Sequence, residues 1–182
     1  AENGKKPTQF QETLAEIGIP DIRYPEGLQH FDIEKDLSHP YIHADLSQCI
    51  NCFRCVRACE EIQGEMVLNM SGRGFATQII KGFDTNFDSA CVSCGACVQT
   101  CPTEALSDKY FTKTLLPDKM VRTTCTYCGV GCQLNIHVTD GKIMGIQAPE
   151  TAEVNLGHTC LKGRFAFEFY AHPDRLKEPM IK

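Results

Sequence analysis

Apolar residues near the start of the chain recur with the period of a helix. The positions concerned are Phe10, Leu14 and Ile17, which share one helical face. Thr8 stands where a helix is commonly capped, and Gly18 stands where one commonly ends. The pattern predicts a short helix between them, within an otherwise irregular arm over residues 1–40 that wraps a neighbouring surface.

Two later stretches predict β-hairpins. In the first, Ser71-Gly72-Arg73-Gly74 is typical of a tight turn and separates the apolar segments 66–70 and 75–80. In the second, Asp140-Gly141 follows the alternating segment 134–138 and precedes two further isoleucines. Asp-Gly between apolar alternations is a strong local signal for a hairpin.

Composition adds one dominant feature, which is the presence of twelve Cys and no Trp. The net charge of −5 disfavours nucleic acid as a partner, since a nucleic-acid binder needs a basic surface to meet phosphate. The apolar runs are far shorter than a membrane-spanning helix requires, and no signal segment opens the chain. We therefore expect a cytoplasmic protein without a membrane span.

Eight of the cysteines form an internal repeat, which predicts one structural unit used twice. Both halves have the spacing Cys-x2-Cys-x2-Cys-x3-Cys, in Cys49, Cys52, Cys55, Cys59 and in Cys91, Cys94, Cys97, Cys101. Disulfides are disfavoured because nothing indicates a secreted protein, and zinc because its cysteine pairs are usually a dozen or more residues apart. Four cysteines in one short run, twice over, favour iron–sulfur clusters.

The spacing also predicts which cysteines share a cluster. Each Cys-x2-Cys-x2-Cys loop curls round a four-iron cube and supplies three thiolates, with its backbone N–H groups directed at the sulfides. The fourth cysteine starts a helix that leads away, so it ligates the cluster of the other half. We expect cluster 1 at Cys49, Cys52, Cys55 and Cys101, and cluster 2 at Cys91, Cys94, Cys97 and Cys59.

A third set of cysteines has a different layout. Three lie close together and the fourth follows much later, in Cys125, Cys128, Cys132 and Cys160. These four thiolates predict a third [4Fe–4S] cluster, cluster 3. After the last of them, Leu161–Tyr170 is apolar and aromatic enough for a short helix that stops before Pro173.

The repeat resembles the two-cluster bacterial ferredoxins over residues 41–108. That resemblance implies an α+β fold in which residues 41–110 form a ferredoxin-like domain that carries electrons between two [4Fe–4S] clusters. We expect residues 111–120 to form a linker. Residues 121–182 then form a small [4Fe–4S] domain that contains the second hairpin.

The third unit resembles the N-terminal cluster domain of molybdenum or tungsten bis-pterin oxidoreductases, and most of all formate dehydrogenase catalytic subunits. The resemblance rests on Cys-Thr-Tyr-Cys-Gly-Val-Gly-Cys at 125–132, on Gly-His-Thr-Cys-Leu-Lys-Gly-Arg at 157–164 and on the run 172–179. It implies that the domain abuts a bis-pterin guanine dinucleotide cofactor and that Lys162 lies between cluster and pterin. A cation there would stabilise the reduced cluster, although a lysine on a helix can also be simply solvated.

The order of the three units also resembles the large iron–sulfur subunit of respiratory complex I and the longer NAD-linked formate dehydrogenases. Those relatives often carry an upstream cluster with a His ligand, whereas no cysteine precedes Cys49 in this chain. His30, His39 and His43 could be remnants of such a site. Each is better explained as an ordinary surface or core histidine, because every cluster already has four thiolates.

The chain ends at Lys182, where these relatives begin their catalytic body, so we expect no catalytic residue in it. The resemblance implies an electron-transfer subunit, or N-terminal part, of a formate dehydrogenase or carbon dioxide reductase. Three [4Fe–4S] clusters would connect a molybdenum or tungsten bis-pterin site on a partner chain to another redox subunit, linked to NAD(P), ferredoxin or hydrogenase. The alternatives are a stand-alone polyferredoxin carrier and the iron–sulfur part of a complex-I-like or hydrogenase-linked assembly. A carrier would need neither Lys162-Gly163-Arg164 nor the run 172–179.

Overall fold

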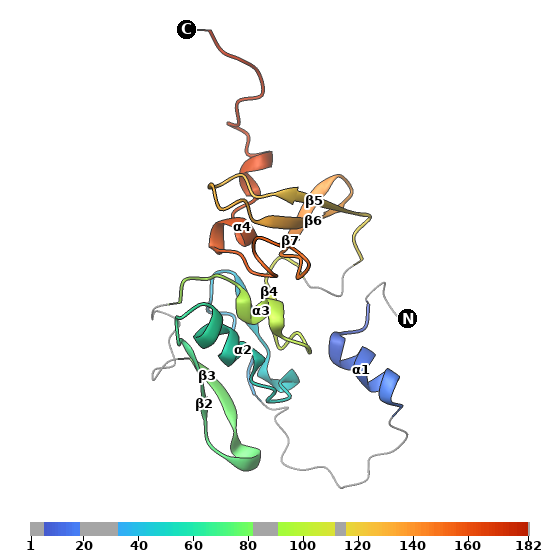
Figure 1. Cartoon of the computed structure of the whole chain (residues 1–182), viewed down its shortest axis with the longest axis vertical. Coiled ribbons are helices and arrows are strands. Elements are labelled where there is room, and N and C mark those ends of the chain that lie inside the picture. The colour runs from blue at the N-terminus through green and yellow to red at the C-terminus, as the bar shows by residue number, and fades with distance from the viewer. Residues whose placement is uncertain (1–5, 19–32, 82–90, 112–115, 182) are drawn as a thin grey trace.

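The computed structural model describes residues 6–18, 33–81, 91–111 and 116–181 of the 182-residue chain. Much of the predicted N-terminal arm, including His30, and part of the predicted linker lie outside the described residues. The rest is α+β, with short helices and small antiparallel sheets. Figure 1 shows two stacked parts, a lower one that carries the cysteine repeat and an upper one that carries the third cysteine set. No helix in the described ranges has both the length and the apolar character needed to cross a bilayer.

The N-terminal helix α1 (Gln9–Ile17) forms where its sequence predicts. Thr8 caps its first turn in a reciprocal capping box, and Gly18 ends it in the left-handed conformation with φ of 66°. None of its residues is buried. The helix is held at its N-terminal end, where the N–H of Phe10 donates to the carbonyl of Pro102 at 3.1 Å.

The lower part is assembled from both halves of the cysteine repeat. The first half contains β1 (Ile42–Ala44), η1 (Leu46–Gln48), α2 (Arg54–Arg57) and η2 (Ala58–Ile62), and the second half contains α3 (Ala96–Thr100) and β4 (Leu106–Asp108). Strand β1 pairs with β4 in antiparallel register, which brings the start of the first half against the end of the second. Helix α2 of the first half packs against α3 of the second half.

A hairpin projects from this lower part, as Figure 1 shows. It consists of β2 (Leu68–Ser71) and β3 (Gln78–Lys81), joined through the short η3 (Gly74–Ala76). The hairpin predicted at this place is therefore confirmed. Gly72 makes the turn possible, because its φ is +75° and a side chain there would collide with the carbonyl of Ala76.

The core of the lower part includes a buried residue of the upper part, Phe165, and the partly buried Leu161 packs against that core. Its buried apolar side chains are Ile42, Ala44, Val56, Leu68, Ile79, Val98, Leu106 and Phe165. Phe165 also stacks on the ring of Tyr41, with ring centroids 4.9 Å apart and an interplanar angle of 15°. Five cysteines of the repeat pack against the same core, which places their thiols next to closely packed side chains.

The upper part is built on a three-stranded sheet in the order β5 (Lys119–Thr124), β6 (Gln133–Thr139) and β7 (Lys142–Gln147). The predicted hairpin is confirmed as β6 and β7, whose turn residues Asp140 and Gly141 both have positive φ. Strand β5 was not expected. It begins inside the predicted linker, and its exposed residues lack the alternation that identifies a strand.

The C-terminal helix is shorter than its composition predicts. Helix α4 (Leu161–Phe165) ends where Ala166 leaves the helical region, and η4 (Glu168–Ala171) follows as a separate turn. The hydroxyl of Tyr170 accepts the N–H of Ile143 at 2.9 Å. This tertiary hydrogen bond joins the segment after α4 to β7.

Candidate iron–sulfur centres

The first candidate centre is a cavity lined by cysteines from both halves of the repeat. Its thiols are those of Cys49, Cys52, Cys55 and Cys101. The remaining wall is almost entirely apolar and includes Leu46, Phe53 and Ile79. The last cysteine of the second half thus stands with the first three cysteines of the first half.

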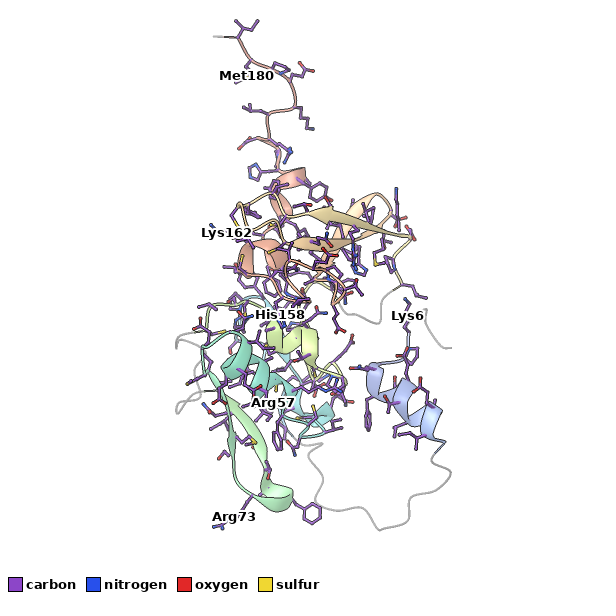
Figure 2. The ribbon with its side chains drawn as sticks, viewed as in Figure 1. Lys6, Arg57, Arg73, His158, Lys162 and Met180 are labelled. Carbon is purple, nitrogen blue, oxygen red and sulfur yellow. The ribbon has the colours of Figure 1, made fainter. Side chains whose placement is uncertain are left out.

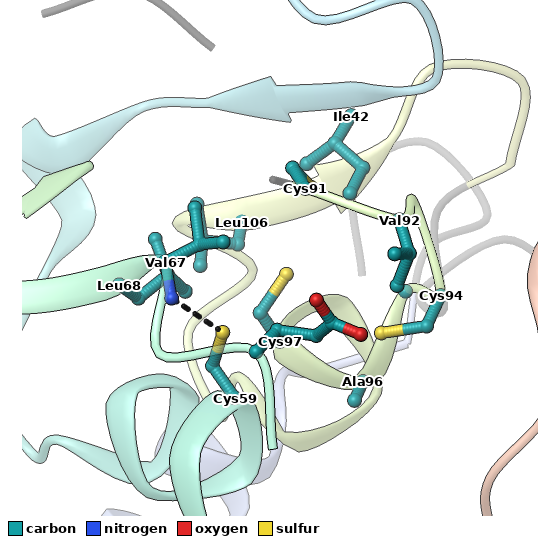
Figure 3. A pocket seen from close by; sticks show the side chains of 12 residues that line it. Ile42, Cys59, Val67, Leu68, Cys91, Val92, Cys94, Ala96, Cys97 and Leu106 are labelled. Atoms are coloured by element: carbon teal, nitrogen blue, oxygen red, sulfur yellow. Dashed lines mark hydrogen bonds between the residues drawn. The ribbon is translucent and has the colours of Figure 1, made fainter. Parts of the chain in front are cut away.

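The second candidate centre is the reciprocal arrangement. Its thiols are those of Cys91, Cys94, Cys97 and Cys59, and Figure 3 shows the sulfurs of the last three directed into a common space. Val67, Leu68 and Leu106 supply part of the apolar wall. Glu65 lines this cavity as well, so an acidic group lies near the second centre.

The two loops owe their curvature to left-handed residues at matching places. These are Asn51 and Phe53 in the first loop, with φ of 52° and 59°, and Ser93 and Gly95 in the second, with φ of 54° and 73°. The helices α2 and α3 start directly after the second of these residues. The prediction that a helix begins at each fourth cysteine is therefore wrong, because each helix already begins one residue before the third.

Backbone N–H groups point at several of the sulfurs. The N–H of Asn51 lies 3.4 Å from Sγ of Cys49, and the N–H of Val67 lies 3.3 Å from Sγ of Cys59. Hydrogen bonds of this kind stabilise a thiolate and raise the reduction potential of a cluster that it ligates. Soft thiol ligands ringing a cavity, with N–H donors aimed at the sulfurs, fit an iron–sulfur cube.

Two of these thiols, those of Cys55 and Cys97, favour the protonated form when no metal is bound. Burial, followed by the charges of Cys101, Cys49 and Cys52, raises the pKa of Cys55 to about 12. Burial likewise raises the pKa of Cys97. Cluster binding must therefore displace protons from these thiols. No group of three or more His, Cys, Asp or Glu in the described part of the chain is arranged to hold a single metal ion.

The third candidate centre is more open to solvent. The loop that carries Cys125 and Cys132 is closed by a backbone hydrogen bond of 2.7 Å between these two residues. Burial, and then the charges of its three fellow thiols, raises the pKa of Cys132, so all four sulfurs lie within electrostatic reach. Cys128 and Cys160 are exposed.

Lys162 lies on α4, two residues after Cys160, and its side chain is exposed on the upper part (Figure 2). It lines a cavity together with Cys125 and the aromatic residues Tyr127 and Tyr170. This location puts a cation beside the third cysteine set, on the exposed surface of the upper part.

His39 is a site residue whose contacts the sequence did not reveal. Its side chain is 2% exposed, and burial, followed by the charges of Lys81 and Lys109, lowers its pKa to about 4, which leaves the ring neutral. The Nδ1 atom accepts the N–H groups of Tyr41 and Ile42 at 3.1 and 3.0 Å. The ring proton therefore resides on Nε2, which lies 3.2 Å from Oγ of Ser93 and 3.8 Å from Sγ of Cys91.

His39 is thus a core histidine, as expected, but it also presents an N–H to a predicted cluster ligand. His43 is half-buried on β1, and no comparable contact is seen for it among the described residues. Arg164, part of the Lys162-Gly163-Arg164 motif, likewise has contacts that the sequence did not reveal. It is buried on α4 and donates to the side chain of Gln99 at 3.0 Å, across the boundary between the two parts.

Comparison with protein families assigns each part separately. Residues 39–107 match the ferredoxin-like domain of NADH-quinone oxidoreductase subunit 3. Residues 118–172 match the molybdopterin oxidoreductase Fe4S4 domain. These matches confirm the resemblance that the cysteine motifs indicate.

Individual relatives cover almost the whole chain. A subunit of an NADH-quinone oxidoreductase of Rhizobium meliloti is 32% identical over 96% of this chain and 20% of its own length. The alpha subunit of an NADPH-Fe(3+) oxidoreductase of Geobacter sulfurreducens is 37% identical over 91% of the chain and 19% of its own length. A Staphylococcus aureus protein with the provisional name formate dehydrogenase is 28% identical over 86% of this chain and 21% of its own length. The chain spans about a fifth of the length of these curated relatives.

Proposed function

Because the chain belongs to the iron–sulfur electron-transfer domains of the molybdopterin oxidoreductase family, we propose that it conducts electrons within a formate dehydrogenase or carbon dioxide reductase. Three [4Fe–4S] clusters transfer the electrons. Cluster 1 is held by Cys49, Cys52, Cys55 and Cys101, cluster 2 by Cys91, Cys94, Cys97 and Cys59, and cluster 3 by Cys125, Cys128, Cys132 and Cys160.

The observation that carries this proposal is the composition of the two cavities in the lower part. Each is lined by four cysteines, and in each the fourth comes from the opposite half of the repeat. This crossing is what two adjacent cubes require when the last cysteine of each motif leads away from its own loop. Two neighbouring clusters that share one core provide a short path for electrons.

We place a molybdenum or tungsten bis-pterin domain, on a partner chain, against the surface that carries cluster 3. Exposed apolar side chains support that docking face, namely those of Tyr127, Val130 and Phe169, with Val130 62% exposed. Lys162 is proposed to stand at this junction. Electrons then continue through the lower part to a further redox subunit that uses NAD(P), ferredoxin or hydrogenase, in an assembly that we expect in the cytoplasm.

Metal analysis tests the cofactor content. Protein purified without oxygen is expected to contain about twelve iron and about twelve acid-labile sulfides per chain, since a four-thiolate site suits a cube. Zinc without sulfide would contradict the proposal outright. Eight iron with eight sulfides would limit it to two of the three sites.

The role of Lys162 is tested in the assembled complex. Lys162→Ala is expected to leave all three clusters in place, because an amine is not a ligand here, and to slow their reduction by formate. Reduction of the isolated chain by dithionite serves as the control and should not change. Formate-driven reduction at the wild-type rate would show that Lys162 is an ordinary surface residue.

A second candidate function is the iron–sulfur part of a complex-I-like assembly. It is favoured by the 32% identity to the NADH-quinone oxidoreductase subunit of Rhizobium meliloti and by the 37% identity to the NADPH-Fe(3+) oxidoreductase subunit. The reductant distinguishes the two functions. Rapid reduction of the clusters by formate in the native complex supports the first, whereas reduction by NADH or NADPH without a formate response supports the second.

A further inference from the structure

Arg164 is a buried cation at the boundary between the two cluster-bearing parts. Its side chain is 2% exposed, and its Nη2 donates to Oε1 of Gln99 at 3.0 Å. Within the described residues its Nε has no hydrogen-bond partner and no carboxylate lies within ion-pair distance. Burying a guanidinium with so few partners is unfavourable unless another negative charge compensates it.

The arginine lies directly on the loop of the second centre. A Cβ atom at Gly95 would stand 2.3 Å from Cδ and 2.5 Å from Nε of Arg164, so only glycine leaves room for this side chain. Gly95 lies between Cys94 and Cys97 in the sequence. The guanidinium therefore reaches the backbone of the loop that supplies three thiols to the second cavity.

The charges that face Arg164 are mostly negative or neutral. Buried Asp108 and the sulfurs of Cys94 and Cys97 interact with it electrostatically. His158 faces it as well, but burial and then the arginine charge lower the pKa of that histidine and favour its neutral form. Thiolates that bind a cluster next to Gly95 would supply the missing negative charge.

We propose that Arg164 clamps the upper part onto the loop of cluster 2 and raises the reduction potential of that cluster above the potential of cluster 1. The inference rests on the proposed function, since it requires clusters at these cysteines. In the step concerned, cluster 3 gives one electron to cluster 2. Cluster 3 becomes oxidised and cluster 2 becomes reduced, and no bond breaks and no proton moves.

Electrostatics gives the direction of the effect. Reduction adds one negative charge to a cluster, and a fixed cation in a region of low dielectric constant stabilises the more negative state. Glu65 lines the same cavity and opposes Arg164, while Lys81 acts on Cys91 in the same sense as the arginine. In the described part of the chain, no charged residue lines the cavity of cluster 1.

The test is a redox titration of the full chain followed by electron paramagnetic resonance, with Cys94→Ser identifying the signal of cluster 2. Arg164→Gln is expected to lower the ratio of reduced to oxidised cluster 2 about tenfold at a fixed potential, which corresponds to about 59 mV for one electron. Arg164→Lys keeps a positive charge and should restore most of the shift. The matched control is Arg57→Gln, which removes an exposed arginine two residues from Cys59 and should change little.

The inference would be overturned if Arg164→Gln and Arg164→Lys shifted the reduction potential of cluster 2 equally. It would also be overturned if the Arg57→Gln control shifted that potential as much as Arg164→Gln does. An unchanged potential in Arg164→Gln would overturn it as well. If that variant does not fold, Asp108→Asn takes its place, since an asparagine oxygen can still accept the N–H of Tyr110, 2.8 Å from Oδ1. Removing this negative charge should raise the same potential, and an unchanged or lower value would count against Arg164.

Hydrogen exchange supplies a readout of the clamp itself. Amides in α3 and α4 should lose protection in Arg164→Gln and retain it in Arg57→Gln; equal protection would overturn the clamp. Iron and sulfide contents are measured first. Wild-type protein that contains zinc and no sulfide contradicts the proposed function, whereas about twelve iron and about twelve sulfides with unchanged potentials contradict the role of Arg164 alone.

Discussion

The two halves of the cysteine repeat have similar loop conformations but carry different residues at the matching positions 53 and 95. Phe53 and Gly95 both lie in the left-handed region just before a helix. The aromatic side chain of Phe53 packs on the core beside the first cavity. Gly95 has no side chain, and the side chain of Arg164 from the upper part occupies the space beside its backbone.

This difference shows how a repeat can produce two equivalent sites in unequal surroundings. The first cavity is lined by both halves of the repeat, and its walls around the thiols are almost entirely apolar. In the second, the ring Nε2 of His39 lies near Cys91, and the side chain of Arg164 covers the loop at Gly95. Similar ligand sets can therefore differ in reduction potential, because polar surroundings tune a cluster as strongly as its ligands do.

The largest effect is expected from replacing the fourth cysteine of each motif, which lies in the cavity of the opposite half. Cys101→Ser should perturb cluster 1, and Cys59→Ser should perturb cluster 2, because each fourth cysteine lies in the cavity of the opposite half. Loss of about four iron per chain, with a change in only one paramagnetic signal, is the expected result for each. A change of Cys101 that altered only the cluster at Cys91–Cys97 would show that the halves bind their clusters independently.

Making the second loop resemble the first should have the next largest effect. Gly95→Ala introduces a side chain at positive φ and against Arg164, so we expect a loss of about 3 kcal/mol or more in the free energy of unfolding. The reverse change, Phe53→Gly, loses aromatic packing but relieves a left-handed side chain, for a net loss of about 1 kcal/mol. Denaturant unfolding under anaerobic conditions compares them, and equal losses would refute the special role of Gly95.

The contribution of His39 should be smaller and confined to cluster 2. His39→Leu removes the N–H that faces Cys91 and leaves the N–H groups of Tyr41 and Ile42 without their acceptor. We expect a stability loss of about 1–2 kcal/mol and a fall of about threefold in the ratio of reduced to oxidised cluster 2. His43→Leu, on the adjacent strand, is the control. A shift of cluster 1 instead would contradict the geometry.

The smallest effect concerns the ion pair between Asp36 and Lys81, whose lysine acts electrostatically on Cys91 of the second centre. Burial raises the pKa of Asp36, but hydrogen bonds from Lys81 and Ser38 outweigh it and hold the value at about 2. Because the folded pKa is depressed, the stabilisation is complete above pH of about 4 and is lost as the pH falls toward about 2. After allowance for partial exposure we expect about 1 kcal/mol at neutral pH.

Asp36→Asn checks this contribution in unfolding experiments at a series of pH values. The difference in stability from the wild type should shrink as the solution is acidified below pH of about 4. A difference that stays constant down to pH of about 3 would mean that the carboxylate charge is not responsible.

Local signals in the sequence determined the short-range features of this protein. The capping residue and glycine around α1, the Asp-Gly turn between β6 and β7 and the turn between β2 and β3 each lie within a few residues of the element that they define. Cysteine spacing belongs to the same class, because ligands two and three residues apart can meet only through the conformation of one loop. The family resemblance rested on these same motifs.

Only the tertiary structure decided how those local units meet. Strand β5 is defined by its pairing with β6, and the segment after the short helix α4 is joined to β7 through Tyr170. Arg164 is as polar as any surface residue in the sequence, yet a glycine 69 positions earlier creates the space that buries it. Contacts between residues so far apart depend on packing of the whole fold, and a single sequence carries no local pattern that records them.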